Sequence, residues 1–162
     1  MNEIVQTELK KIFNGRFSTS ESTRANYARG EDTYDPILSK AVVFPETNEE
    51  VSQLLKLCND HKIPVVPFGT GTSLEGHVVG NQNGITISLE KMNKVLSVNA
   101  EDFDCRVQAN VTRKQLNEYL REDGVFFPID PGANAAIGGM ASTSASGTMA
   151  VKYGTMKTVI TG

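Results

Sequence analysis

The sequence predicts a chain with two kinds of β-structure: a small parallel strand–helix–strand unit and, after it, an antiparallel sheet. Two short apolar runs flank an amphipathic helix pattern within residues 41–67, and a crossover of this length implies parallel strands joined by a right-handed connection. From residue 84 onward apolar and polar residues alternate, which is typical of half-exposed antiparallel strands. A glycine-rich loop follows each part, at 64–77 and 131–148.

The first 40 residues are polar and weakly periodic, and we expect them to form an N-terminal extension ahead of a domain at 41–162. Four apolar residues are spaced to share one face of a short helix: Ile4, Leu9, Ile12 and Phe13. The stretch 17–35 is rich in Ser, Thr, Arg and Asp, and is predicted to be a loop.

The parallel unit begins with an apolar run at 41–44, which suits a buried strand. Thr47 and Glu50 then form a capping-box pattern at the start of a helix. The apolar face of that helix is predicted from four residues at helical spacing: Val51, Leu54, Leu55 and Cys58. A second buried strand is predicted at 63–67, so the first glycine loop lies at the carboxyl end of a parallel strand, where ligands collect.

The antiparallel part is predicted to contain three strands: 85–89, 95–98 and 105–108. The turn between the last two covers 99–104. A second capping box at 112–115 starts a helix, and Gly124 suits the position just past its end. Residues 157–162 are predicted to be a further strand.

The composition is ordinary for a soluble globular chain, with 39% hydrophobic and 22% charged residues. A net charge of −3 argues against nucleic acid as a partner. No apolar run approaches the roughly 20 residues needed to cross a bilayer, and the acidic N-terminus does not resemble a secretory signal. Cys58 and Cys105 indicate neither a disulfide framework nor a metal site. We therefore expect a cytoplasmic protein without a membrane span or metal.

The first glycine loop does not fit the common nucleotide-binding motifs. Gly69 and Gly71 begin like a dinucleotide-binding fingerprint, but the third glycine is replaced by Leu74. A P-loop would require Lys and Ser or Thr where His77 and Val78 stand. Taken alone, this loop is better explained as a tight turn after a buried strand.

The second glycine loop makes a ligand site the better interpretation. Gly138 and Gly139 precede three hydroxyl side chains at 142–144. Hydroxyls and bare backbone amides can bind a pyrophosphate without lysine, and glycine allows a ligand to approach the backbone closely. Two such loops predict a long ligand with an anionic middle, such as a dinucleotide. The alternative is a surface loop of low complexity.

Together the two loops closely resemble FAD-linked oxidases of the vanillyl-alcohol-oxidase type, which carry a PCMH-type FAD-binding domain. The resemblance rests on Pro67-Phe-Gly-Thr-Gly-Thr-Ser-Leu-Glu-Gly-His77 and on Asp130-Pro-Gly-Ala, Ile137-Gly-Gly-Met-Ala, Ser146-Gly-Thr and Tyr153-Gly-Thr155. It covers residues 41–162 and is greatest to the branch of D-lactate dehydrogenases and glycolate oxidase FAD subunits. It implies an α+β fold in which the small parallel βαβ unit and the antiparallel sheet hold FAD.

The resemblance implies that both loops bind FAD, the first around the pyrophosphate and the second along the flavin and the pyrophosphate. The implied residues are Pro67, Phe68, Gly69, Thr70, Gly71, Thr72, Ser73, Leu74, Pro131, Gly132, Ile137, Gly138, Gly139, Thr143, Ser146, Gly147 and Tyr153. Some relatives attach the flavin covalently through a His at the position of Thr72, so non-covalent FAD is implied here. No catalytic residue is expected, because His61 and His77 both have structural explanations.

The implied reaction is hydride transfer from a small 2-hydroxy acid, D-lactate or glycolate, to FAD. The substrate domain of the family is expected beyond residue 162, so the chain is expected to be an incomplete FAD-binding domain that is inactive alone. A homodimer or an electron-accepting partner subunit is the expected partner. Two alternatives stay open: a non-catalytic nucleotide-binding or interaction module, and oxidation of an aryl alcohol or a sugar on the same fold.

Overall fold

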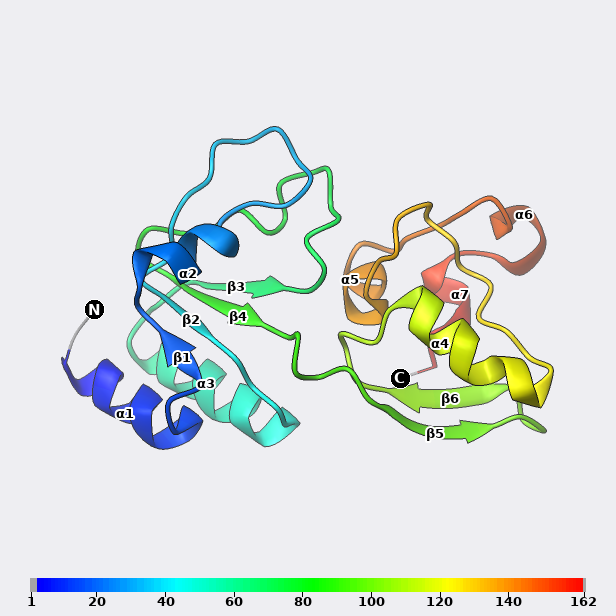
Figure 1. The fold of residues 1–162 in the computed structure, drawn as a ribbon, viewed down its shortest axis with the longest axis horizontal. Helices are drawn as coiled ribbons and strands as arrows, with labels where there is room; N and C mark the ends of the chain where they lie inside the picture. The colour runs from blue at the N-terminus through cyan, green and yellow to red at the C-terminus, as the bar shows by residue number, and fades with distance from the viewer. Residues whose placement is uncertain (1–2, 162) are drawn as a thin grey trace. The chain divides into compact units, whose positions relative to one another are not determined.

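The computed structural model describes residues 3–161 of the chain. These residues form two compact units, of which the first ends at Lys91 and the second begins at Met92. Figure 1 shows the elements of both, and each unit is described by itself. None of the helices in residues 3–161 is long and apolar enough to cross a membrane.

The first unit is built on a four-stranded sheet with the order β1-β2-β4-β3. The strands are β1 (Phe17–Ser18), β2 (Ala41–Val43), β3 (Val65–Phe68) and β4 (Ile85–Ser88). β4 runs parallel to both β2 and β3, and Ile87 is the register partner of both Val43 and Pro67. β1 pairs antiparallel with β2. The predicted parallel unit is therefore confirmed, with a third parallel strand between its two strands.

The prediction that residues 85–89 form a half-exposed antiparallel strand is wrong. β4 is the central parallel strand, and all four of its residues are buried. The alternation of apolar and polar residues suggested one solvent-exposed face, but polar residues of a strand can also be buried when their hydroxyls are hydrogen-bonded within the protein. Thr86 Oγ1 donates to Ser39 Oγ at 2.8 Å, so this face is covered by protein.

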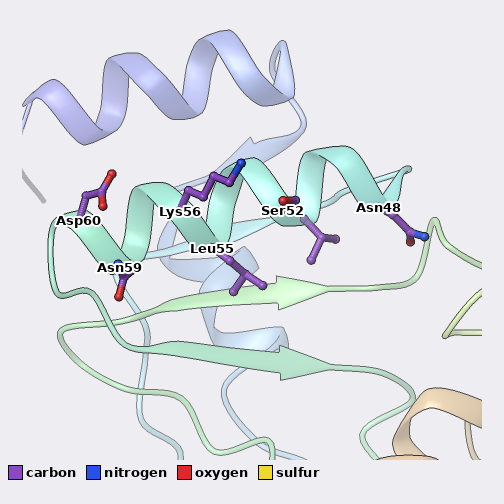
Figure 2. A pocket seen from close by; sticks show the side chains of 7 residues that line it. Asn48, Ser52, Leu55, Lys56, Asn59 and Asp60 are labelled. Atoms are coloured by element: carbon purple, nitrogen blue, oxygen red, sulfur yellow. The ribbon is translucent and has the colours of Figure 1, made fainter. Parts of the chain in front are cut away.

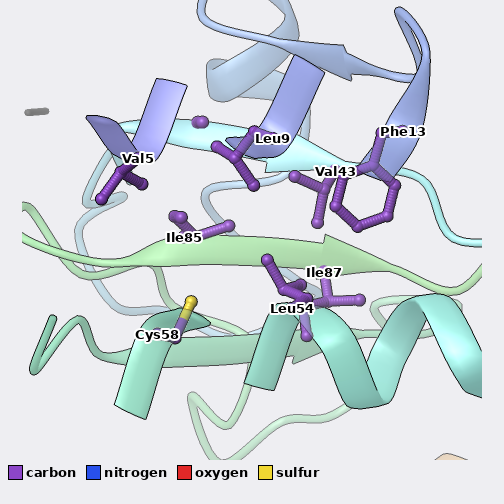
Figure 3. Close-up of a cluster of buried hydrophobic side chains, with 9 residues drawn as sticks. Val5, Leu9, Phe13, Val43, Leu54, Cys58, Ile85 and Ile87 are labelled. Carbon is purple, nitrogen blue, oxygen red and sulfur yellow. The ribbon is translucent and has the colours of Figure 1, made fainter. Parts of the chain in front are cut away.

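Two helices, α1 (Glu3–Phe13) and α3 (Asn48–Asp60), pack against the sheet. Figure 3 shows their side chains meeting those of β2 and β4 in one cluster. The buried members are Val5, Leu9, Phe13, Ala41, Val43, Leu54, Cys58, Ile85 and Ile87. Ile4, predicted on the buried face of α1, is instead 59% exposed. Residues 3–40 thus add two helices and a strand to this unit, and a boundary of the FAD-binding domain at residue 40 stays a prediction.

The prediction of a loop over residues 17–35 is wrong in part. Phe17 pairs with Val43 in the sheet, and α2 (Glu21–Asn26) follows, with the Ser20 side chain accepting a hydrogen bond from the Thr23 amide. A strand of two residues and a helix of six are too short to leave a periodic pattern in the sequence.

The second unit begins with an antiparallel hairpin of β5 (Val95–Asn99) and β6 (Asp104–Val107). α4 (Arg113–Leu120) and the 3₁₀ turn η1 (Arg121–Asp123) follow. Thr112 caps α4 by accepting from the Gln115 amide, and Gly124 ends η1 with a φ of +69°, as the sequence predicts. α4 buries Leu116 and Leu120 against the half-buried residues of the hairpin.

Three short helices complete the second unit: α5 (Ile137–Ser142), α6 (Ala150–Tyr153) and α7 (Met156–Val159). The strand predicted at 157–162 is wrong over its described part, because α7 occupies most of it, and Gly162 lies outside the described residues. Met156 is fully buried with Ile129 and Met140, and its amide donates to the Ala145 carbonyl at 2.9 Å. This packing stabilises α7 in a segment whose residue types favour a strand.

Candidate cofactor-binding loops

The first loop, residues 69–77, leaves the carboxyl end of β3, and its base is fixed by aromatic packing. The Phe68 ring packs edge-on against Tyr27, with ring centroids 5.2 Å apart, and the Tyr27 hydroxyl donates to Glu90 at 2.6 Å. Gly71 has a φ of +71°, and a Cβ there would lie 2.9 Å from the Phe68 ring. Conformation and space therefore both require glycine at 71.

The backbone amides of residues 70–74 form no hydrogen bond with any residue between 3 and 161. Unpaired backbone N–H groups cost free energy when they are shielded from water without a partner. Consecutive amides left free in a turn are also the group that backbone anion sites use. The first loop contains no Lys or Arg, so an anion bound there would rely on these amides.

The cofactor-binding residues predicted at the end of β3 and in the first loop differ in their exposure. Three are exposed to solvent, namely Pro67, Thr70 and Leu74, and three are half-buried, namely Gly69, Thr72 and Ser73. Phe68 and Gly71 are buried and contribute to the packing just described. The Ser73 hydroxyl lies 2.7 Å from His77 Nδ1, so His77 has a partner within the loop.

The second loop, residues 131–148, is held at its far end by Asp130, which precedes it. The Asp130 carboxylate accepts hydrogen bonds from the Thr148 hydroxyl at 2.7 Å and from the Met149 amide at 3.4 Å. The bond from Thr148 is the main cause that lowers the pKa of Asp130 below its ordinary value. A Cβ at Gly147 would collide with Asp130, so the packing itself explains this glycine.

The adjacent glycines of α5 have different surroundings. The Gly138 amide donates to the Ala109 carbonyl at 2.8 Å, and a Cβ at 138 would lie 2.8 Å from the Ala109 Cβ. Gly139 is exposed and helical, has no left-handed φ, and nothing lies within 4 Å of the Cβ position. Its amide has no hydrogen-bond partner among the described residues. Packing therefore requires Gly138 but not Gly139.

Two of the hydroxyls of the second loop are used by α5 itself. Thr143 Oγ1 donates to the Gly139 carbonyl at 3.0 Å, and Ser142 Oγ donates to the Gly138 carbonyl at 2.9 Å. Ser146 is exposed. The Tyr153 ring packs edge-on against Phe126, with centroids 5.5 Å apart, and Lys152 Nζ lies 4.9 Å from its centroid.

The start of the second loop is fixed to its own unit. Ile137 donates its amide to the Val111 carbonyl at 2.8 Å, and Asn134 accepts from the Lys114 amide at 3.0 Å. Pro131 is half-buried, and Gly132 has a φ of +85° with open space around its Cβ position, so it serves the turn.

A separate open surface lies along one face of α3 and contains neither loop. All seven residues that line it belong to that helix, and Figure 2 shows the side chains of Leu55 and Lys56 among them. No group of three or more His, Cys, Asp or Glu that could hold a metal ion occurs within residues 3–161. His61 follows the last residue of α3 as its C-cap.

The sequence interpretation did not assign a role to Asp130 or to the segment before β2. Asp130 begins the Asp130-Pro-Gly-Ala motif, but its hydrogen bonds reach residues 148 and 149. Contacts between residues so far apart in the sequence leave no local sequence pattern. The segment 28–39 contacts the first loop through residues that are far apart in the sequence.

Comparison with known proteins gives a family and a set of relatives. Residues 39–162 match the family model described as FAD binding domain. A probable mitochondrial D-lactate dehydrogenase of Danio rerio is 50% identical over 140 residues, which is 86% of this chain and 28% of the relative. A mitochondrial D-lactate dehydrogenase [cytochrome] of Arabidopsis thaliana is 40% identical over 153 residues, which is 93% of this chain and 27% of the relative.

A glycolate oxidase subunit of Bacillus subtilis is 28% identical over 148 residues, covering 90% of this chain and 32% of the relative. Among solved structures, an alkyldihydroxyacetonephosphate synthase superposes with a TM-score of 0.88 at 24% identity, covering 97% of this chain and 33% of that one. At that identity the likeness shows the fold alone. The chain thus spans about a third or less of the length of each of these four proteins.

Proposed function

The chain belongs to the FAD binding domain family, and from this membership we propose that it is the cofactor-binding part of a flavin-dependent 2-hydroxy-acid dehydrogenase. FAD is the cofactor of the family. When bound, it accepts a hydride from the substrate carbon that carries the hydroxyl group. D-lactate and glycolate are the proposed substrates, since the relatives are named D-lactate dehydrogenases and a glycolate oxidase subunit.

We assign the pyrophosphate of FAD to the first loop. The free amides of residues 70–74 present several donors in one short segment, and this fits a doubly charged group that finds no Lys or Arg in the loop. The Thr70 and Thr72 hydroxyls are hydrogen-bonded to each other at 3.2 Å, which leaves one hydroxyl proton of the pair as a further donor. The role of the chain here is to bind and orient the cofactor.

The single observation that carries the proposal is that Gly139 is an exposed helical glycine with no neighbouring atom within 4 Å of its Cβ position. Glycine inside a helix costs roughly 1 kcal/mol of stability relative to alanine, and no neighbour within 4 Å requires its presence. A bare backbone at an exposed position is explained by a ligand that lies directly against it. We propose that FAD occupies the space beside Gly139.

We assign no proton transfer to residues 3–161. His77 is bonded to Ser73 within the first loop, and His61 caps α3. We therefore expect the 162 residues alone to bind FAD weakly or not at all and not to turn over D-lactate. A homodimer, an electron-accepting partner subunit and a cytoplasmic location stay predictions; several relatives are named as mitochondrial proteins.

The experiment that tests the proposal is flavin release from the purified full-length enzyme of which this chain is proposed to be a part. Thr72 stands where covalent relatives carry His, so the yellow protein should release all of its flavin on heat denaturation, and chromatography should identify that flavin as FAD. Flavin that remains in the precipitate would contradict non-covalent binding. A full-length enzyme that takes up no FAD at millimolar concentration would contradict the function itself.

A further inference from the structure

The segment 28–39, which we call the strap, lies between α2 and β2 and has no assigned role. It contains neither helix nor strand, yet Ala28, Asp32 and Ser39 are buried with exposed fractions of 1, 5 and 2%. The match to the family model begins only at residue 39. Figure 1 shows the strap beside the chain that leaves β3.

The strap is bonded to the chain after β3 near both of its ends. Three hydrogen bonds join them: Glu31 amide to Gly71 carbonyl at 2.9 Å, Gly80 amide to Ala28 carbonyl at 3.4 Å, and Asn81 amide to Ser39 Oγ at 3.2 Å. The bond from Glu31 fixes the Gly71 carbonyl, which lies within the segment 70–74 whose amides are unpaired. The bonds at Gly80 and Asn81 fix the chain just after the first loop.

The contact between the strap and the first loop is too close for side chains at two glycines, Gly30 and Gly76. A Cβ at Gly30 would lie 2.5 Å from the Gly71 carbonyl oxygen, and a Cβ at Gly76 would lie 2.7 Å from the Tyr34 ring. Gly71 and Gly76 also have left-handed φ values of +71° and +72°. The strap therefore covers the two points at which the loop reverses its backbone.

Asp32 holds the strap in the shape that makes these contacts. Its buried carboxylate accepts from the Gly30 amide at 3.2 Å and from the Tyr34 amide at 3.0 Å. A buried carboxylate is stable only when such donors satisfy it. These two bonds bracket Glu31, whose amide contacts the first loop, and fix the backbone of Tyr34.

We propose that the strap positions the first loop for FAD, with Tyr34 and Asp32 as positioning residues that do not touch the cofactor. The inference rests on the proposed function of that loop. A flexible loop must be ordered when it binds, and this ordering reduces the affinity; a loop already held in its bound shape avoids the cost. The strap supplies this order from outside the matched family domain.

Tyr34→Ala tests the proposal without touching a buried group, since Tyr34 is 56% exposed. Loss of the ring frees Gly76, and we expect the dissociation constant for FAD to rise about fivefold or more, because the ordering cost returns. Tyr34→Phe keeps the ring and should restore wild-type affinity. Tyr119→Ala, at an equally exposed tyrosine (57%) on α4, is the matched control and should leave the affinity unchanged.

Hydrogen exchange of the Glu31 and Gly80 amides provides a readout that does not depend on FAD. Tyr34→Ala should speed exchange at both amides while the amides of β4 stay slow. Unchanged exchange, or an FAD affinity equal to that of Tyr34→Phe, would overturn the role of the strap. Failure of the wild-type full-length enzyme to bind FAD would instead refute the proposed function, and the exchange result would still decide whether the strap orders the loop.

Discussion

At the scale of single residues, the same amino acid serves different purposes in the two loops. Gly147 and Gly138 leave room for Asp130 and Ala109, and Gly71 adopts a left-handed backbone beside Phe68. Gly139 has none of these reasons. The surroundings of the Cβ position therefore distinguish Gly71, Gly138 and Gly147, which the fold requires, from Gly139, which we assign to a ligand.

A residue-scale prediction concerns Glu50, which joins the start of α3 to the loop before β1. Arg16 donates to both carboxylate oxygens of Glu50, with Nη1 at 2.8 Å from Oε2, and also to the Phe44 carbonyl at 2.9 Å. The hydrogen bond from Arg16 lowers the pKa of Glu50 below its ordinary value of 4.5. Glu50→Gln should therefore lower the free energy of unfolding by about 1–3 kcal/mol at pH 7, the range for bonds to charged groups.

The pH dependence follows from the direction of that shift. Because the pKa of Glu50 is lower in the folded state, its stabilisation is complete above the unfolded pKa near 4.5 and disappears as the pH falls through the folded value. Urea unfolding at pH 7 and at successively lower pH should show the difference between wild type and Glu50→Gln shrinking in acid. Glu49→Gln, at the exposed neighbouring position, is the control, and an equal effect of both variants would contradict the role of the ion pair.

At the scale of elements, the sequence predicts those with caps and a clear period. α3 and α4 begin one residue after their predicted N-caps, and Thr47 accepts from the Glu50 amide at 3.2 Å. β4 and α7 are mispredicted for a common physical reason. Thr86 and Met156 are buried by segments distant in the sequence, and tertiary contacts of this kind override local preference.

The two leucines in the middle of α3 give a prediction at the element scale. Leu54 is fully buried between α3 and the sheet, whereas Leu55 is 46% exposed on the open face of α3 in Figure 2. Leu54→Ala should lower the free energy of unfolding by about 2–5 kcal/mol, because it removes buried methyl groups and leaves a cavity. Leu55→Ala should change it by less than about 0.5 kcal/mol. Urea unfolding measures both, and equal losses would contradict the assigned face of α3.

At the scale of the whole molecule, the sequence locates the two loops through their glycine motifs but not what supports them. The strap has no periodicity, and its contacts join residues 28–39 to residues 71–81. Likewise, the sequence predicts that the Thr143 hydroxyl contacts the cofactor, whereas in the structure this hydroxyl donates to the Gly139 carbonyl of α5. The class of ligand could thus be predicted from composition and motifs. Which residues are free to bind that ligand and which support the loops could be seen only from the packing in the structure.

The measurement that tests the central claim most directly is an FAD titration of Gly139→Ala and Gly139→Val in the full-length enzyme alongside their urea unfolding. Gly139→Ala should stabilise the FAD-free protein by roughly 1 kcal/mol, because alanine favours the helix. FAD binding should nevertheless weaken in Gly139→Ala and fall by about tenfold or more in Gly139→Val, since each side chain fills the space that FAD needs. Ser142→Ala, in the same helix, should keep wild-type affinity. FAD affinity that is unchanged in Gly139→Val would contradict the claim that this loop binds the cofactor.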